Sequence, residues 1–460
     1  MSEWKGKRVV VVGLGVSNIP LIRFLLRKGA IVEGRDKKSP EKLGERYFEL
    51  RGLGVDCLLG ANYLNDLDKF DTVFLSPGIP KNLPELRAIQ GVVPFSSETE
   101  LVLRYAKAPI FGITGSSGKT TTTTLVGEML KASGLPTYVG GNIGVPLIEE
   151  IESIPEHARI VLELSSFQLE LLNQSPHGAL ITNISENHLD IHGTMDNYIQ
   201  AKKQIFTHQT DEDIAVFNFD DPLTKEMGKE STGSAFYFSK NEPVPRGTFT
   251  YEKIIYFRNG PHAYPVIDQG DIRLRGEHNL ENVLAASLLA HLAGADWHSI
   301  RGVAKRFTGV PHRLEKVQTI KGVTYYNDSI ATTPTRAIAG VKSFKEPVIL
   351  IAGGYDKLLS FDEFADVVTD RTVKTLILFG ATAKKIQKCV EETAKRKGNP
   401  KKPQIVLVSD LEDAVGLTSQ IANRGDIVLL SPACASFDMY NSFQERGQHF
   451  RDLVARLLES

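Results

Sequence analysis

The chain has 460 residues, of which 42% are hydrophobic and 24% charged, and its formal net charge at pH 7 is −1. This ordinary globular composition and length predict about three domains. The balanced charge argues against a broad nucleic-acid-binding face and is compatible with local anion sites. Three widely spaced cysteines indicate reduced thiols in a cytoplasmic protein. The N-terminus lacks the apolar core of a signal peptide, and no apolar run reaches the ~18 residues of a membrane span.

The first segment has the pattern of a βαβ unit. A β-branched run at 8–12 enters Gly13-Leu14-Gly15-Val16-Ser17, a helical pattern covers 19–28, and a second strand ends at Asp36. An acidic residue at this distance from the glycines is placed to meet a ribose. Asn18 replaces the third glycine of the dinucleotide fingerprint, so a nucleotide diphosphate other than NAD fits better. The strand at 71–75 ends in Ser76-Pro77-Gly78, which is either a second ligand loop or a simple β-turn.

The strand at 108–113 leads into the most informative stretch, Thr114-Gly115-Ser116-Ser117-Gly118-Lys119-Thr120-Thr121, and a helical pattern continues to 133. Such a loop directs backbone N–H groups at phosphates, the lysine neutralises phosphate charge, and the threonine hydroxyl can bind Mg²⁺. The general phosphate-loop pattern has a glycine where this chain has Ile113. The alternative, a glycine-rich turn that only caps a helix, does not explain the Lys-Thr pair.

Later strands carry polar residues toward the same sheet edge. Glu163 lies in the apolar run 160–164, where a carboxylate is costly unless it is paired or metal-bound; the alternative is a strand end in water. His188 follows the strand at 179–184, and beside a phosphate loop it is expected to serve a Mg²⁺ site rather than a purely structural role. Lys202 and Lys203 are adjacent on a predicted helix, 195–206, and the residues alone single out neither.

The chain then continues through short strands, expected at 214–218, 254–257 and 271–274, into a long helix at 283–293. The stretch 276–282 opens this helix, and in it Asn279 and Asn282 lie one helical turn apart, where they could face one ligand. Capping explains Asn279, but it does not explain Asn282, which falls within the helix.

The last third predicts a second doubly wound sheet. Strands are expected at 323–326, 348–352, 375–379, 405–408 and 427–430, with helices between them, and three strands end in loops rich in polar or small residues. The expected fold class is therefore α/β, with domains at 1–97, 98–309 and 310–460.

Nine motifs in this order resemble the Mur ligase family over essentially the whole chain: TGSSGKTTT, GGNIG, LELSSFQLE, TNISENHLD, EHNLENVLAA, PHR, NDSIATTP, GGYDK and SPACASFDMYNSFQERG. The resemblance implies an N-terminal Rossmann-like domain, a central ATPase-type domain with a phosphate loop and a mostly parallel sheet, and a C-terminal Rossmann-like domain. It is strongest to the branch that adds glutamate to UDP-N-acetylmuramoyl-alanine in peptidoglycan synthesis. In that reaction ATP phosphorylates the substrate carboxylate, and the amine of glutamate attacks the acyl phosphate, which gives an amide, ADP and phosphate.

The resemblance also implies roles for residues around ATP and Mg²⁺. Lys119, His188 and Lys202 are the expected catalytic residues, and Lys202 matches a carbamylated lysine of the family. The expected metal ligands are Thr120, Glu163, His188 and carbamylated Lys202. The residues expected to bind ATP are Gly115, Ser116, Ser117, Gly118, Lys119, Thr120, Thr121, Asn282, Arg313 and Asp328.

Two further sets of residues concern the other substrates. The UDP-linked substrate is expected on Val16, Ser17, Asp36, Ser76 and Asn142, and glutamate on Thr332, Lys357, Ser436 and Phe443. Family members commonly carry a lysine where this chain has Ile330, so a positive contact is missing there or is supplied from elsewhere. The alternatives are ligation of L-glutamate or of another Mur-type amino acid, and a nucleotide-binding regulator without catalysis. The resemblance further implies a monomer that acts on small molecules.

Overall fold

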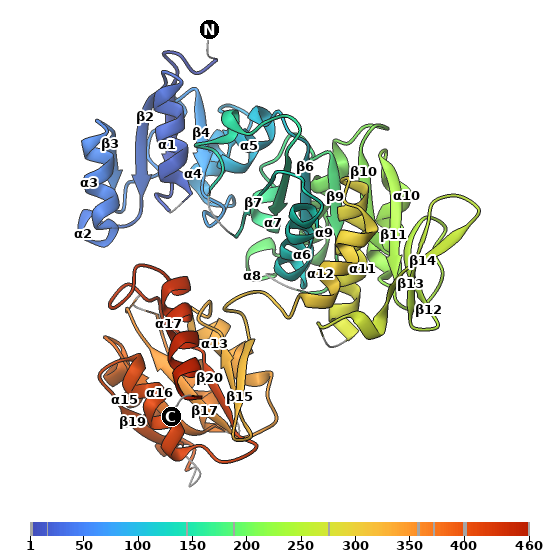
Figure 1. The fold of residues 1–460 in the computed structure, drawn as a ribbon. Helices are drawn as coiled ribbons and strands as arrows, with labels where there is room; N and C mark the ends of the chain where they lie inside the picture. Colours follow the sequence, from blue (N-terminus) through green and yellow to red (C-terminus); the bar gives the residue numbers. More distant parts are fainter. Residues whose placement is uncertain are drawn as a thin grey trace. The chain divides into compact units, whose positions relative to one another are not determined.

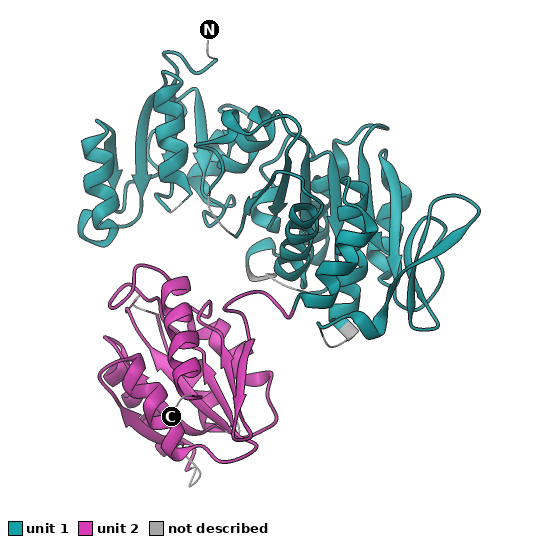
Figure 2. Ribbon diagram, viewed as in Figure 1, with its two compact units in different colours: residues 1–307 teal, residues 308–460 magenta. Residues whose placement is uncertain are grey.

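The structure is a computed structural model that describes residues 3–15, 17–143, 146–186, 189–274, 277–356, 359–370, 373–398 and 403–458. Its elements alternate between strand and helix over most of the chain (Figure 1). The chain divides into two compact units, Met1–Phe307 and Thr308–Ser460 (Figure 2). None of the helices among these residues is long and apolar enough to cross a membrane.

The first sheet of unit 1 has five parallel strands in the order β3-β2-β1-β4-β5. Its centre is β1, whose valines at 9–12 are fully buried, as expected of a parallel strand covered on both faces. Its elements are β1 (Arg8–Val12), α1 (Asn18–Arg27), β2 (Ile31–Asp36), α2 (Pro40–Leu43), α3 (Glu45–Gly52), β3 (Asp56–Leu59), β4 (Thr72–Leu75), α4 (Pro84–Ile89) and β5 (Phe95–Ser96), with a 3-10 turn at Leu67–Lys69.

The second sheet of unit 1 has nine strands in the order β14-β13-β12-β11-β10-β9-β6-β8-β7. The strands from β7 to β12 along this order are parallel, and β13 is antiparallel to both of its neighbours, β12 and β14. Its strands are β6 (Ile110–Thr114), β7 (Thr137–Gly141), β8 (Arg159–Glu163), β9 (Gly178–Ile181), β10 (Ile214–Asn218), β11 (Ser234–Ser239), β12 (Gly247–Tyr251), β13 (Ile254–Arg258) and β14 (Ala263–Asp268). The helices around it are α5 (Glu98–Tyr105), α6 (Lys119–Ala132), α7 (Ser166–Leu169), α8 (Leu189–His192), α9 (Met195–Thr207), α10 (Pro222–Glu230), α11 (Glu277–Leu292) and α12 (Trp297–Arg306).

Two hydrophobic cores cover the two faces of this sheet. Leucines, valines and alanines of α6, α11 and α12 pack on one face, against side chains such as Phe111, Val161 and Leu180. The other face packs against α7 and α9, and the same core continues through α5 into α1 and β1 of the first sheet. The two sheets of unit 1 therefore share one hydrophobic core.

Unit 2 is a six-stranded sheet in the order β15-β16-β20-β17-β18-β19, parallel except for the edge strand β15. Its elements are β15 (Glu315–Ile320), β16 (Val323–Asn327), α13 (Pro334–Lys342), β17 (Val348–Gly353), α14 (Asp362–Asp370), β18 (Val373–Phe379), α15 (Ala383–Arg396), β19 (Gln404–Leu407), α16 (Leu411–Ile421), β20 (Ile427–Leu430) and α17 (Phe443–Arg456). Helices α13 to α15 pack on one face, and α16 and α17 on the other.

The expected α/β class is confirmed, and one predicted element is wrong. The hairpin piece expected at 271–274 is not a strand, because the strand is β14 at Ala263–Asp268 and a 3-10 turn follows at Gln269–Asp271. Pro265 lies inside β14, and a proline is tolerated there because this strand forms the sheet edge. The domain bounds 1–97, 98–309 and 310–460 stay a prediction.

Candidate active site

The glycine-rich loop joins β6 to α6 at the carboxyl edge of the nine-stranded sheet. Gly115 and Gly118 have φ of +148° and +79°, and Gly118 is the N-cap of α6. A Cβ on Gly115 would collide with Thr182 Oγ1, and one on Gly118 with Asn282 Oδ1. Only glycine can adopt these positive φ values and also leave room for the neighbouring side chains. The backbone conformation of the loop therefore requires glycine at positions 115 and 118.

The loop is tied to the residues that follow the neighbouring strand β9. The backbone N–H of Ser116 donates to the Asn183 carbonyl at 2.9 Å, and that of Ser117 donates to Asn183 Oδ1 at 3.0 Å. The Thr182 hydroxyl donates to the Ser117 carbonyl at 2.6 Å. The loop is therefore preorganised by residues 182–185, the TNIS segment. The sequence did not reveal this supporting role.

Two lysine ammonium groups meet at one loop carbonyl. Lys119 Nζ donates to the carbonyls of Gly115 at 2.7 Å and Ser116 at 3.3 Å. Lys202 Nζ reaches the same Gly115 carbonyl at 3.0 Å and Thr114 Oγ1 at 3.3 Å from α9, and it lies 4.7 Å from the ring centroid of Tyr198. Lys202 is 1% exposed, and burial, followed by the charge of Lys119, lowers its pKa to about 7.

Glu163 ends β8, the strand next to β6, and is 2% exposed. Asn142 Nδ2 donates to Glu163 Oε1 at 2.8 Å, while Glu163 Oε2 is buried without a hydrogen-bond partner among the described residues. A buried carboxylate oxygen without a partner is costly, and a hard divalent cation is a ligand that would satisfy it. Thr120 is half-buried in the first turn of α6. In the described part of the chain, no group of three or more His, Cys, Asp or Glu side chains could hold a metal ion.

A cluster that the sequence analysis missed lies beside the loop. Tyr198 OH is 3.0 Å from Ser116 Oγ, and the Tyr198 ring packs edge-on against His192, with 5.2 Å between centroids. The buried His192 Nε2 is 2.9 Å from Ser166 Oγ, and its Nδ1 is 2.8 Å from Glu170 Oε1. The sequence signal that could have pointed to Tyr198 is its spacing from Lys202. The two residues are four positions apart in one predicted helix and therefore lie on the same face.

Asn282, from α11, lies at the N-terminus of α6. Its side chain is 6% exposed; Oδ1 accepts from Thr122 Oγ1 at 3.3 Å, and Nδ2 donates to Asn279 Oδ1 at 3.1 Å. Helix α11 therefore places an amide next to Gly118, while the expectation that Asn279 and Asn282 face one ligand stays a prediction.

The residues expected to bind the UDP end follow three strands of the five-stranded sheet: Ser17 after β1, Asp36 at the end of β2, and Ser76 after β4. Leu14 N and Lys38 N each donate to the Asp36 carboxylate at 2.8 Å. Gly13 has φ +88°, and a Cβ there would lie 2.7 Å from Ser76 Cβ. Asp36 thus shapes the glycine loop, while each of its oxygens keeps acceptor capacity for a ribose.

In unit 2, Asp328 follows β16 and is buried. Its carboxylate accepts from Ser431 Oγ at 2.8 Å and from Leu314 N at 3.1 Å. Burial raises the pKa of Asp328 to about 6, against the lowering effects of these two bonds and of Arg313 and Arg336. Arg313 is exposed.

A cavity of about 220 Å³ in unit 2 brings together three of the four residues expected to bind glutamate, Thr332, Ser436 and Phe443. Ser436 Oγ is buried and has no hydrogen-bond partner within the described ranges. Three predicted site residues, Val16, His188 and Lys357, lie outside the described residues.

The sheets and the glycine-rich loop define an α/β protein with a loop of the type that binds phosphates in nucleotide-binding folds. Comparison with known proteins is more specific. Three family models match successive parts of the chain: Mur ligase MurD-like N-terminal domain at residues 7–93, Mur ligase middle domain at 113–290, and Mur ligase glutamate ligase domain at 312–434.

Full-length relatives agree with these models. A protein from Symbiobacterium thermophilum named UDP-N-acetylmuramoylalanine–D-glutamate ligase is 49% identical over 454 residues, which are 98% of this chain and 98% of that protein. A protein of the same name from Acetivibrio thermocellus is 44% identical over 451 residues, covering 98% of this chain and 96% of that protein. The chain belongs to the Mur ligase family, whose members are ATP-dependent and generally require Mg²⁺.

Among solved structures, UDP-N-acetylmuramate-alanine ligase from Thermotoga maritima aligns with 98% of this chain and 99% of its own, with a TM-score of 0.52 and 20% identity. This likeness concerns the fold alone.

Proposed function

We propose that the chain is an ATP-dependent ligase that adds D-glutamate to UDP-N-acetylmuramoyl-L-alanine and releases ADP and phosphate, in peptidoglycan precursor synthesis. The observation that carries this proposal is the 44–49% identity to full-length relatives that bear the name of this activity. The geometry of the phosphate loop and of the cavity in unit 2 supports it independently.

ATP is assigned to the loop from Gly115 to Thr121, together with Asn282, Arg313 and Asp328. The loop suits phosphates because it leads directly into the N-terminus of α6, where Lys119 begins the helix, and because residues 182–185 hold it in place. Lys119, which donates to loop carbonyls in the structure, has the reach and charge to hold phosphate oxygens. Because phosphoryl transfer depends mainly on positioning and charge neutralisation, these groups supply what the first step needs.

The residues proposed to hold Mg²⁺ are Thr120, Glu163, His188 and carbamylated Lys202. The cation, when bound, offsets negative charge on the transferring phosphoryl group. The unpartnered Glu163 Oε2 supports this assignment, because it offers an anionic oxygen where water is excluded. Asn142, assigned to the UDP-linked substrate, bonds the other oxygen of Glu163, so the substrate residue and the metal ligand are neighbours.

Lys202 suits carbamylation because its side chain is buried against neutral acceptors and carries no ion pair among the described residues. Its unprotonated amine can attack CO₂; a carbamate forms and a proton is released. The product carries oxygen anions that a hard cation prefers. It also removes one of the two positive charges that converge on the Gly115 carbonyl.

The amino acid is assigned to the cavity of Thr332, Ser436 and Phe443, with Lys357 as the expected partner of its side-chain carboxylate. The buried Ser436 hydroxyl offers a donor that no protein group in the described residues uses. Arg336 Nη1 donates to the Ile330 carbonyl at 3.4 Å, so a cation does stand beside the position where family members carry a lysine. We propose that this cation serves the phosphate or carboxylate end of the site.

The decisive experiment measures phosphate release by the purified protein with ATP, Mg²⁺, UDP-N-acetylmuramoyl-L-alanine and D-glutamate, in parallel with L-glutamate, alanine, lysine and diaminopimelate. We expect turnover with D-glutamate. Turnover with L-glutamate or another amino acid instead would support the alternative ligase, and no turnover with any amino acid would refute ligase activity. We further propose that the protein acts as a cytoplasmic monomer.

A further inference from the structure

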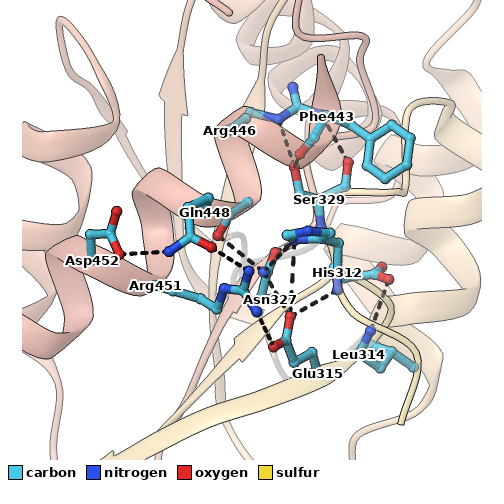
Figure 3. A network of polar contacts seen from close by, with 12 residues as sticks. His312, Leu314, Glu315, Asn327, Ser329, Phe443, Arg446, Gln448, Arg451 and Asp452 are labelled. Atoms are coloured by element: carbon cyan, nitrogen blue, oxygen red, sulfur yellow. Dashed lines mark hydrogen bonds and ion pairs between the residues drawn. The ribbon is translucent and has the colours of Figure 1, made fainter. Parts of the chain in front are cut away.

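Arg446 is the most completely buried cation in the described part of unit 2. It lies in the first turns of α17, its exposed fraction is 0%, and it donates four hydrogen bonds. Nε donates to Ser329 Oγ at 3.0 Å, Nη2 to the Ser329 carbonyl at 2.9 Å and the Cys434 carbonyl at 3.1 Å, and Nη1 to the Ala435 carbonyl at 3.1 Å. Figure 3 shows the guanidinium of Arg446 turned toward Ser329.

These partners belong to the segments that form the cavity of Thr332, Ser436 and Phe443. Ser329 starts the loop that ends at Thr332, and Ala435 is the residue before Ser436. Phe443 lies on α17, one helical turn before Arg446, and its carbonyl accepts from Ser329 Oγ at 2.8 Å (Figure 3). One side chain therefore links all three segments that carry the cavity-lining residues.

The guanidinium of Arg446 forms no ion pair with an acid of the described residues. All four of its acceptors are carbonyl or hydroxyl oxygens, and no carboxylate of the described residues lies within ion-pair distance. Asp438, an acid of the same loop, instead accepts from Ala381 N at 3.1 Å. Arg451, farther along α17, shows the usual arrangement, with Nη1 3.0 Å from Glu315 Oε1 (Figure 3).

A buried cation held only by neutral acceptors is expensive to desolvate, so stability alone gives no reason for an arginine at this position. A planar guanidinium can donate in several fixed directions at once, which is what three converging segments require. Its positive charge, which no described acid contacts, also favours an acidic ligand in the adjoining cavity.

We propose that Arg446 is a positioning residue for the acidic amino-acid substrate, which holds the segments of Thr332, Ser436 and Phe443 in the geometry that binds it. This inference rests on the proposed function, because it assigns the cavity to that substrate. Arg446 acts through the carbonyls and the serine that it holds and does not touch the amino acid.

The test is the steady-state kinetics of Arg446→Lys, which keeps the charge and loses the fork of donors. We expect its KM for D-glutamate to rise more than tenfold, while its KM values for ATP and UDP-N-acetylmuramoyl-L-alanine stay within twofold of the unmodified protein. The matched control is Phe450→Leu, because Phe450 is equally buried on α17, one turn after Arg446, and packs in the hydrophobic core. It should lower the unfolding temperature without raising the KM for D-glutamate.

A second variant covers the case in which Arg446→Lys does not fold. Ser329→Ala removes the hydroxyl that links Arg446 to Phe443 and leaves the charge in place, and we expect its KM for D-glutamate to rise about threefold. The inference is overturned if both variants leave this KM unchanged, or if Phe450→Leu raises it as much as Arg446→Lys does. An unmodified protein that turns over no acidic amino acid refutes the proposed function, and this inference falls with it.

Discussion

Replacing Gly118 by alanine perturbs the loop at the point where it enters α6. Gly118 has φ +79°, and a Cβ there would lie well inside contact distance of Asn282 Oδ1. The alanine variant therefore faces two separate penalties, one from its own backbone and one from the displaced amide of Asn282.

The two penalties can be estimated separately. A left-handed backbone costs an L-residue about 1 kcal/mol or slightly more. Moving the Asn282 amide breaks its bonds to Thr122 and Asn279, which are 3.3 and 3.1 Å long. Each is worth about 1 kcal/mol, so the displacement adds about 2 kcal/mol.

Gly134, which follows the other end of α6, provides the control. Its φ of +77° is nearly the same, and a Cβ there meets nothing within 4 Å. Gly134→Ala thus has the backbone penalty and the same change in unfolded-chain entropy, without the clash. We expect Gly118→Ala to be less stable than Gly134→Ala by about 2 kcal/mol in urea unfolding, with a KM for ATP raised at least tenfold in Gly118→Ala alone.

Equal losses of stability in the two variants would refute the reasoning, because the approach of Asn282 to Gly118 would then have no energetic weight. A stability difference of the expected size with an unchanged KM for ATP would keep the packing argument and refute the assignment of Gly118 to the ATP site.

Three further predictions concern titratable groups. Lys119→Ala should lower turnover, measured as phosphate release, by about a hundredfold or more, because a phosphate loses its counter-charge; near-normal turnover would refute the loop assignment. Lys202→Ala should lose activity that added acetate or another short carboxylic acid partly restores, whereas Lys119→Ala should show no such rescue; without rescue the carbamate role is wrong. The pKa of Asp328 is about 6 in the folded protein, compared with an ordinary value of 3.8 for an unfolded chain. The folded protein therefore holds this proton more tightly, which stabilises it by about 3 kcal/mol at low pH. This contribution is lost as the pH rises through 6. Asp328→Asn should therefore show a flatter dependence of the urea midpoint on pH between about pH 4 and 6, and parallel curves for the two proteins would contradict the argument.

Local patterns predicted the regular elements well where one periodicity dominates. The β-branched run at 8–12 is β1, and the helix expected at 195–206 is α9, Met195–Thr207. The edge strand β14 was missed because Pro265 is a strand-breaking signal everywhere except at an edge, and edge position is a property of the whole sheet.

The candidate site was harder to predict, because its members come from distant strands and helices. The sequence could not choose between Lys202 and Lys203. In the structure, Lys202 points into the loop and is 1% exposed, whereas Lys203 forms an ion pair with Glu230 at 2.7 Å. Which of two adjacent lysines is buried depends on the face that α9 turns to the sheet, and that face is fixed by tertiary packing. The sequence does not single out Arg446 either, because a lone arginine in a helical pattern usually lies at the surface and its burial depends on tertiary packing.

The hydrophobic cores of the two compact units are formed by separate parts of the chain. The cores of residues 1–307 contain no described side chain from beyond residue 307, and those of residues 308–460 are equally self-contained. The cavity assigned to the amino acid and its positioning residue Arg446 lie entirely within residues 308–460, whereas the phosphate loop lies within residues 1–307. Exchanging residues 308–460 for those of a relative would therefore replace the assigned amino-acid cavity, together with Arg313 and Asp328, and would preserve the folding core that carries the phosphate loop.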